Sequence, residues 1–306
     1  MPRGFFTQSA TVLFADAPSS EAVASALDAL DVPVTRRSAE PSWLSGGTEL
    51  LVPFGEPSGG HVHVDVVAHA WPDTMGDPEK EPALFAAWSM GAFGPLVFPR
   101  NLERAVGQAV AFRDAARAVS GHRAFVRMRT SYLVGAGPES RVMPEGWSAF
   151  EEIHAMLQVV RPLLSLEGAI AYFDPNAEVL LPAEGVERVL DSPEAEGATP
   201  LELFSHVRLF NIDPTWSMMD TVGLDRFFLP DVEVLITRDV DPNQVAGLLR
   251  NLSGYLLDGE VVEDGHTVEA PFGVLHVHAR DESLTEPPRR VLRMVPDGAE
   301  LPEGAL

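Results

Sequence analysis

Three histidines and an aspartate near residue 65 form the group whose spacing is closest to that of a metal site. His61, His63 and Asp65 alternate with valines, and His69 follows four residues later. On a strand, alternate residues share one face, so His61 and His63 could supply two metal ligands. A rise of about 3.3 Å per residue, however, spaces the whole set too widely to close around one ion. The pattern therefore favours solvent-facing histidines on a strand, and we expect no bound metal and no cofactor.

Residue types that are scarce in this chain exclude several other chemistries. The sequence has no cysteine, which excludes disulfides, thiolate catalysis and cysteine-ligated metals. Lys80 is its only lysine and lies in the acidic stretch 77–81, a poor place for Schiff-base chemistry or phosphate binding. Gly135 and Gly137 follow a predicted strand, but the next helix begins only near Ser148. These glycines therefore do not form a dinucleotide-binding loop, which needs a helix N-terminus directly beside them.

Residues 71–104 combine aromatic side chains with many glycines and prolines, and such irregular backbone is costly to order. The segment either fills space inside the fold or lines a ligand-binding surface. The candidate binding surface, which adds two arginines from a neighbouring strand, comprises Trp71, Asp73, Trp88, Phe93, Arg104, Arg127 and Arg129. Because paired arginines suit an anionic ligand, the alternative function is an enzyme of unknown reaction acting on an anionic small molecule. The catalytic residues of such an enzyme stay unknown.

Hairpin signals and a few long helices must position these residues. The spacing of apolar residues predicts one long helix at about 100–119, and Ser148 and Glu151 form a capping box that starts another. Asp241, followed by a proline at the first helical position, begins the last helix. This mixture, rather than strict βαβ alternation, predicts an α+β fold with two lobes of mostly antiparallel sheet and helices packed on one side. The predicted parts are an N-terminal half (1–140), a linker (141–147), a C-terminal half (148–295) and a mobile tail (296–306).

Two tryptophan-containing segments relate the predicted halves. A strand leads into the segment from Trp71 to Gly76 in the first half, and another leads into the segment from Trp216 to Gly223 in the second. A Pro-containing stretch, a long amphipathic helix and a strand then follow in each half. One interpretation is a diverged duplication, and the other is chance similarity between two α+β halves.

The charge of this 306-residue chain limits the classes of partner that it can bind. Its 45 acidic and 22 basic residues give a formal net charge of −23. Such a surface repels nucleic-acid phosphates and anionic lipid headgroups, and it attracts basic proteins. No apolar run approaches the roughly 20 residues of a membrane span, and the N-terminus lacks the apolar region of a signal peptide. We therefore expect a soluble, cytoplasmic protein that binds neither nucleic acid nor membranes.

Several motifs resemble one bacterial family. The first half contributes Trp71-Pro72-Asp73 and Trp88-Ser89-Met90-Gly91, and the more specific motif of the second half is Met219-Asp220-Thr221-Val222-Gly223-Leu224, followed by Leu229-Pro230-Asp231-x-Glu233. Together they resemble bacterial proteins that carry the domain of unknown function numbered 4261 in their C-terminal part. Phe228 departs from the pattern, because a glycine is expected before Leu-Pro-Asp. The resemblance implies no activity and no site residues.

Charge is the main functional signal that remains. We expect a non-catalytic, acidic protein-binding module, and one concrete form is an immunity or inhibitor protein for a basic toxin. Whether the protein is an enzyme stays open, although the lack of a recognisable catalytic motif favours a non-catalytic protein. Trp71 and Trp88 could anchor an interface only if they are exposed, so their burial decides this part of the hypothesis. The sequence does not indicate the oligomeric state.

Overall fold

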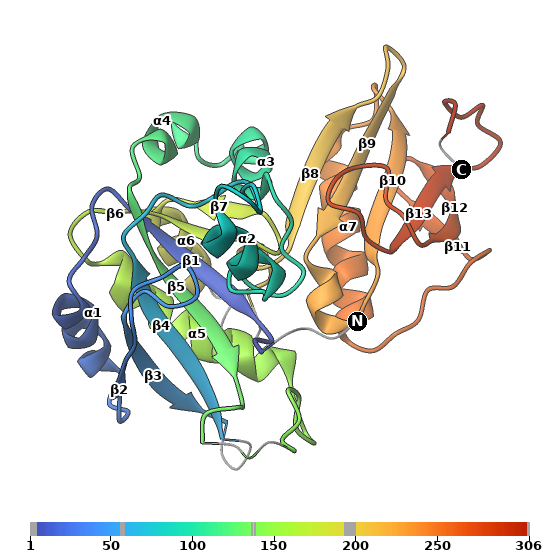
Figure 1. Ribbon diagram of the computed structural model, residues 1–306. Helices are drawn as coiled ribbons and strands as arrows, with labels where there is room; N and C mark the ends of the chain where they lie inside the picture. Colours follow the sequence, from blue (N-terminus) through green and yellow to red (C-terminus); the bar gives the residue numbers. More distant parts are fainter. Residues whose placement is uncertain (1–4, 56–58, 136, 138, 193–199, 305–306) are drawn as a thin grey trace. The chain divides into compact units, whose positions relative to one another are not determined.

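The computed structural model describes residues 5–55, 59–135, 137, 139–192 and 200–304, and the chain divides into two units, Met1–Phe204 and Ser205–Leu306 (Figure 1). Each unit contains one sheet, of seven strands in the first and six in the second, together with helices. This confirms the predicted α+β fold with two lobes of mostly antiparallel sheet. Among the described residues, no helix is both long and apolar enough to cross a membrane.

The sheet of the first unit has the strand order β2-β3-β4-β5-β1-β6-β7, and all neighbouring strands are antiparallel. The strands are β1 (Ser9–Phe14), β2 (Thr35–Ser38), β3 (Thr48–Phe54), β4 (Gly60–Val67), β5 (Ala124–Ser131), β6 (Ala169–Asp174) and β7 (Val179–Leu181). Every residue of β1 and β5 is buried, which is expected for central strands covered on both faces.

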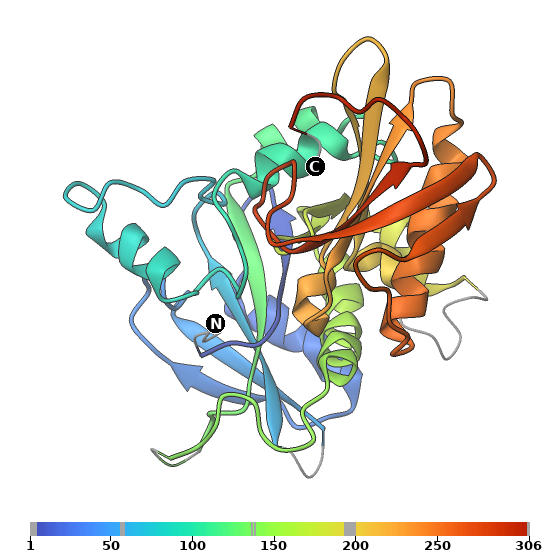
Figure 2. The ribbon, with the colours of Figure 1, turned by 90° about the vertical axis from the view of Figure 1, so that its right-hand side faces the viewer.

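Helices cover both faces of the first sheet, so the prediction that they pack on one side is wrong for this unit (Figure 2). They are α1 (Ser20–Leu27), η1 (Asp28–Leu30), α2 (Pro82–Ser89), α3 (Asn101–Gln108), α4 (Ala115–Ser120), α5 (Ala149–Leu164), α6 (Ala183–Leu190) and η3 (Leu201–Leu203). α1 and α5 pack together on one side, and α2 lies across the sheet from them (Figure 2). α5 begins as predicted, because the Ser148 side chain accepts a hydrogen bond from the Glu151 N–H at 3.4 Å.

The single long helix predicted at 100–119 is wrong, because the chain forms two short helices there, α3 and α4. Gly107 lies one residue before the end of α3 and lowers its helix propensity. Val110, an apolar residue within the predicted helix, is 89% exposed between the two short helices. The helical spacing of apolar residues therefore extends beyond Gln108, where the first helix ends.

The sheet of the second unit has the order β11-β12-β13-β10-β9-β8, in which β10 and β13 are parallel and the other neighbours are antiparallel. Its elements are β8 (His206–Asn211), β9 (Trp216–Val222), η4 (Leu224–Phe227), β10 (Asp231–Thr237), α7 (Pro242–Leu257), β11 (Thr267–Ala270), β12 (Gly273–Arg280) and β13 (Val291–Pro296). α7 begins at Asp241, as predicted, and packs against β8, β9 and β10.

The boundary between the two units falls between Phe204 and Ser205, and not at the linker expected over residues 141–147. After that stretch, α5 packs on the first sheet and β6 pairs with β1. Residues 148–204 therefore complete the first unit. The tail expected from residue 296 is also partly packed, since Ala299 and Leu301 contact the cluster of Trp216, Leu235 and Val295; residues 305–306 lie outside the described part.

The two tryptophan-containing segments occupy different places in their units. Trp71 lies in the loop after β4, whereas Trp216 is the first residue of β9. The second sheet also contains a parallel pair, β10 and β13, while the first sheet is antiparallel throughout. Because the two segments do not occupy matching places, these differences favour chance similarity over a diverged duplication.

Candidate functional sites: two buried ionic networks

The aromatic residues of the candidate binding surface lie in the core of the first unit. Trp71, Trp88 and Phe93 are 4%, 8% and 1% exposed. The Phe93 ring lies 5.4 Å from the ring of Trp71 and 4.8 Å from that of Trp88. Trp71 also meets Phe125 of β5 and Phe173 of β6 edge-on, at 5.1 and 5.2 Å. These rings fasten residues 71–104 to the sheet, so they do not form exposed interface anchors.

Asp73 and Arg104 have structural partners near α3. The Asp73 carboxylate accepts hydrogen bonds from the N–H groups of Leu102 and Glu103, at 3.0 and 2.8 Å, and so caps the helix. Burial raises the pKa of Asp73 despite these bonds. Arg104 donates from Nε and Nη2 to Glu178 Oε1, at 2.8 and 2.5 Å. The ionic network that holds Arg127 and Arg129 is a separate one.

The first network lies on one face of the first sheet. The strand register places Glu49, Asp65 and Arg127 side by side on β3, β4 and β5, with His63 and Arg129 side by side in the next row. Arg127 donates to both oxygens of Asp65, at 3.1 and 2.6 Å. Arg129 Nη2 lies 3.3 Å from Asp65 and 3.6 Å from Glu49. Two arginines thus face two carboxylates, of which Asp65 is buried and Glu49 is half-buried.

The electrostatics keep this network ionised at neutral pH. Burial acts to raise the pKa of Asp65, but Arg127 and Arg129 outweigh it and hold the pKa at about 2. Burial, with a contribution from Arg127, lowers the pKa of Arg129 to about 10. Burial would also raise the pKa of Glu49, yet the hydrogen bond from His63 and the charge of Arg129 lower it overall. The two arginines are therefore engaged by carboxylates within the chain.

Loop carbonyls and an N-terminal aromatic ring cover the first network. Arg127 and Arg129 both donate to the Ala92 carbonyl, at 2.8 and 3.2 Å. The Phe6 ring lies over the Arg129 guanidinium at 4.1 Å and meets His63 edge-on at 5.5 Å. Beneath it, His63 Nε2 and Arg129 Nε are buried and have no hydrogen-bond partner among the described residues. The Arg127 and Arg129 guanidinium groups thus hold the loop around Ala92 against the sheet. Guanidinium groups also bind anions, so an anion could reach Arg129 only if Phe6 moved away.

The histidine cluster faces solvent only in part, whereas the sequence predicted that all of it would. His63 is 6% exposed, and its Nδ1 lies 2.8 Å from Glu49 Oε1. His61 is half-buried, and burial lowers its pKa. His69 is exposed, with its ring 4.8 Å from that of Trp43. In the described part of the chain, no three His, Cys, Asp or Glu side chains are grouped so that they could hold a metal ion.

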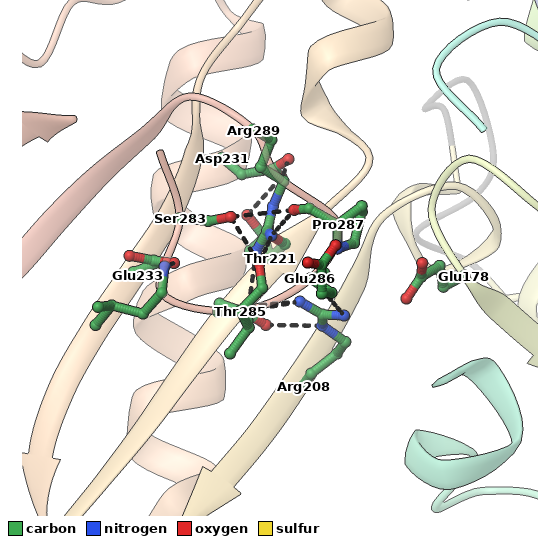
Figure 3. Close-up of polar contacts among 12 residues, drawn as sticks. Glu178, Arg208, Thr221, Asp231, Glu233, Ser283, Thr285, Glu286, Pro287 and Arg289 are labelled. Atoms are coloured by element: carbon green, nitrogen blue, oxygen red, sulfur yellow. Dashed lines mark hydrogen bonds and ion pairs between the residues drawn. The ribbon is translucent and has the colours of Figure 1, made fainter. Parts of the chain in front are cut away.

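The second network crosses the face of the second sheet (Figure 3). The register aligns Arg208, Asp220, Glu233 and Arg293 in one row on β8, β9, β10 and β13. Arg208 donates to both oxygens of Asp220, at 3.0 and 2.7 Å, and Arg289 donates to Asp220 at 2.6 Å. Arg293 Nε lies 2.9 Å from Glu233. The same alternation of acids and arginines thus occurs in both sheets.

These arginines hold residues 281–290, which connect β12 to β13, across the sheet. Arg208 donates to the carbonyl of Glu286 at 2.8 Å, and Arg289 donates to the carbonyl of Pro287 at 2.8 Å (Figure 3). The Thr285 hydroxyl donates to Asp220 at 2.7 Å. We call residues 281–290 the strap. Its attachment consists mainly of charge-assisted hydrogen bonds, which are stronger than neutral ones.

The pKa values of the carboxylates in the second network shift in different directions. Burial acts to raise the pKa of Asp220, but Arg208 and Arg289 outweigh it, so the pKa is lowered. Burial raises the pKa of Asp231 to about 6, although Arg289 and the Thr221 hydroxyl oppose the rise. Burial likewise raises the pKa of Glu233. With an internal partner for each of these charges, the arrangement fits a scaffold better than a reaction centre.

Phe228, the departure from the family pattern, has a left-handed backbone. Its φ is +64° and its ψ is +15°, at the residue that ends η4. An L-residue pays about 1–2 kcal/mol for this conformation, and glycine does not. The glycine expected at this position is therefore explained by the turn that leads into Asp231.

A groove of about 760 Å³ lies among α1, α5 and α6 of the first unit. Its walls include Ala26, Leu30 and Leu157, and Arg161 lies at its polar side. Arg161 already donates to Asp191 at 2.5 Å and pairs with a second carboxylate on α6. The groove therefore offers apolar surface with few free polar groups, which does not define a ligand.

Sequence reasoning missed most of the second network. It placed Asp220, Asp231 and Glu233 in a motif without a role, and it did not single out Arg208, Arg289 or Arg293. A signal was available in the run Val291-Leu292-Arg293-Met294-Val295, where one arginine stands among apolar residues of a strand. A charged residue in such a setting is buried and must be paired.

The comparisons with known proteins bear on the second unit. No curated protein and no solved structure matches the chain. Residues 220–295 match the family described as a domain of unknown function (DUF4261). The matched segment includes Asp220, Asp231, Glu233 and the whole strap. This part of the chain thus resembles proteins that carry the DUF4261 domain.

Proposed function

We propose that this protein is a non-catalytic, acidic protein-binding module whose partner is a basic protein. The supporting observation is the distribution of charge. Seven carboxylate residues and six arginines are buried among the described residues, so burial accounts for only one of the 23 net negative charges. The excess acidity therefore belongs to residues outside the core. Charge of this size steers association with a cationic surface and raises association rates by factors of about 10 to 1,000.

One concrete form of the proposal is an immunity or inhibitor protein that neutralises a basic toxin in the cytoplasm of a bacterium. Burial of Trp71 and Trp88 removes the aromatic anchors that the sequence suggested, so surface charge carries the argument. The two arginines of the alternative enzyme, Arg127 and Arg129, are already engaged by Asp65. No observation favours that alternative over the binding module.

An exposed acidic stretch of the second unit offers a specific place to test. Residues 258–269 contain no lysine or arginine. Two large side chains beside or within the stretch are exposed, Tyr255 at 46% and Val261 at 65%. A tyrosine among carboxylates provides both an anchor and steering charge for a basic surface. The exposed acids are Asp258, Glu260, Glu263, Asp264 and Glu269.

The test is affinity capture from the native cell with two matched variants. The first replaces four acids of the stretch: Asp258→Asn, Glu260→Gln, Glu263→Gln and Glu269→Gln. The control removes four exposed charges of the first unit: Glu40→Gln, Glu79→Gln, Glu145→Gln and Glu167→Gln. We expect the wild type and the control to retain a basic protein at low salt and to release it at high salt.

The first variant should lose this capture. Equal loss in both variants would assign binding to net charge rather than to residues 258–269. Recovery of no specific basic protein by the wild type, at either salt concentration, would overturn the proposed function.

A further inference from the structure

The N-terminal segment, residues 5–8, connects two buried sites on opposite faces of the first sheet. It extends the sheet beyond β1, because the Thr7 N–H donates to the Thr130 carbonyl at 3.0 Å and the Thr130 N–H donates to the Gln8 carbonyl at 3.2 Å. Consecutive residues of such a segment point to opposite faces. Phe6 accordingly covers Arg129 and His63 in the first network. Thr7 points the other way, to Glu152 of α5.

Glu152 is a buried carboxyl group in a polar cluster without a cation. The Thr7 hydroxyl forms a short hydrogen bond with Glu152 Oε1 and lies 2.9 Å from the hydroxyl of Thr130. Glu152 is 0% exposed, and no lysine, arginine or histidine of the described chain forms an ion pair with it. An isolated carboxylate is costly to bury, so the neutral form fits this site.

The groups that face Glu152 can be named element by element. The N-terminal segment presents uncharged Thr7 and Gln8, β5 presents Thr130, and Trp147 precedes the helix. The titratable neighbours are Tyr132, just after β5, and Glu151 on α5 itself. Burial raises the pKa of Glu152 to about 7, although the hydrogen bond from Thr7 and the nearby polar side chains of Trp147, Gln8 and Thr130 oppose the rise. Burial and the charge of Glu152 also raise the pKa of Tyr132.

We propose that Glu152 is a proton-dependent latch, which holds the N-terminal segment closed over His63 and Arg129 when protonated and releases it when ionised. A carboxylate at this position must recruit water, so the least firmly held neighbour gives way. α5 has ten buried residues and packs on five strands of the sheet. The segment is attached to β5 through the two backbone hydrogen bonds given above, so it opens at a lower cost than a buried helix. Release of Thr7 carries Phe6 with it and uncovers the unpartnered Nε2 of His63 and Nε of Arg129.

Amide hydrogen exchange of Thr7, measured by NMR between pH 5.5 and 8.5, tests this latch. Exchange rates are divided by the intrinsic rate at each pH, which gives a protection factor that reports opening alone. For the wild type we expect the protection factor to fall by roughly 10- to 30-fold over this range, because the open state favours the ionised carboxyl. Glu152→Gln keeps the shape of the neutral carboxyl and should make protection independent of pH.

Two further measurements complete the test. Glu151→Gln alters an exposed acid in the same helical turn and should retain the wild-type profile. Thr7→Val removes the hydroxyl while keeping its volume, and it should lower protection at pH 5.5. A constant protection factor in the wild type would overturn the proposal even if a variant failed to fold. Persistence of the pH-dependent fall in Glu152→Gln would overturn it as well.

Discussion

At the scale of single residues, Glu152 connects the burial of a carboxyl group to stability. The pKa of its carboxyl is raised from 4.5 to about 7 by burial, so the folded protein binds more protons than the unfolded chain between these values. The free energy of unfolding contributed by this group is therefore fully present below pH 4.5 and is lost as pH rises through 7. A pKa rise of this size corresponds to about 3 kcal/mol.

The free energy of unfolding of the wild type should fall by about 3 kcal/mol as pH rises through this range, and Glu152→Gln should abolish this fall. Urea unfolding at pH 5 and pH 8 measures it for the wild type, Glu152→Gln and the exposed control Glu151→Gln. Only Glu152→Gln should flatten the difference between the two pH values. The same pH dependence in all three proteins would contradict the burial argument.

Phe228 connects a single backbone angle to the family pattern. Glycine and alanine at this position both remove the half-exposed ring, but only glycine adopts a φ of +64° without strain. We expect Phe228→Gly to be more stable than Phe228→Ala by about 1 kcal/mol in urea unfolding. Equal stability of the two variants would show that the left-handed turn carries no strain.

The residues of the candidate sites were partly predictable. The sequence indicated that Arg127 and Arg129 lie on one polar face of a strand, and the structure places them on one face of β5. Their burial was not predictable, because it depends on Ala92 and Phe6, which are distant in sequence. From its position in the sequence, Glu152 is an ordinary acid in the first turn of a helix, where acids are favoured. Its partners on the N-terminal segment and β5 give no local signal.

At the scale of elements, local signals were reliable and long-range pairing was not. The capping residues Ser148 and Asp241 start α5 and α7 where the sequence places them. The unit boundary was misplaced because β6 returns to pair with β1, more than 150 residues earlier in the chain. Gly135 and Gly137 are typical of a linker, but glycines in a sequence do not show whether the chain afterwards returns to the same sheet.

The carboxylate of Asp220 makes the central contact that attaches the strap to the second sheet. Asp220 accepts hydrogen bonds from Arg208, Arg289 and Thr285, and all three residues contact or belong to the strap. Asp220→Asn leaves two buried arginines without their carboxylate and is expected to destabilise the second unit by about 3–5 kcal/mol. The control Glu282→Gln removes an exposed charge from the strap and should change stability by less than about 0.5 kcal/mol.

Urea unfolding, followed by hydrogen exchange in residues 281–290, measures both variants. Loss of protection across the strap in Asp220→Asn would identify the network as its attachment. If Asp220→Asn were as stable as Glu282→Gln, the second network would not hold the strap.

At the scale of the whole molecule, both units combine neutral buried networks with an acidic exterior. The formal charge is −13 for the first unit and −10 for the second, so neither unit alone carries the acidity. Interactions between exposed charges are screened beyond about 8 Å at physiological ionic strength. An association that depends on this acidity must therefore weaken with salt, mainly through its rate of formation.

The most direct test of the central claim is the association rate constant between this protein and the basic protein that it captures, measured at low and high ionic strength. Our account predicts a fall of about 10-fold or more between roughly 20 mM and 500 mM salt, with little change in the dissociation rate constant. An association rate constant that is the same at both ionic strengths would contradict it.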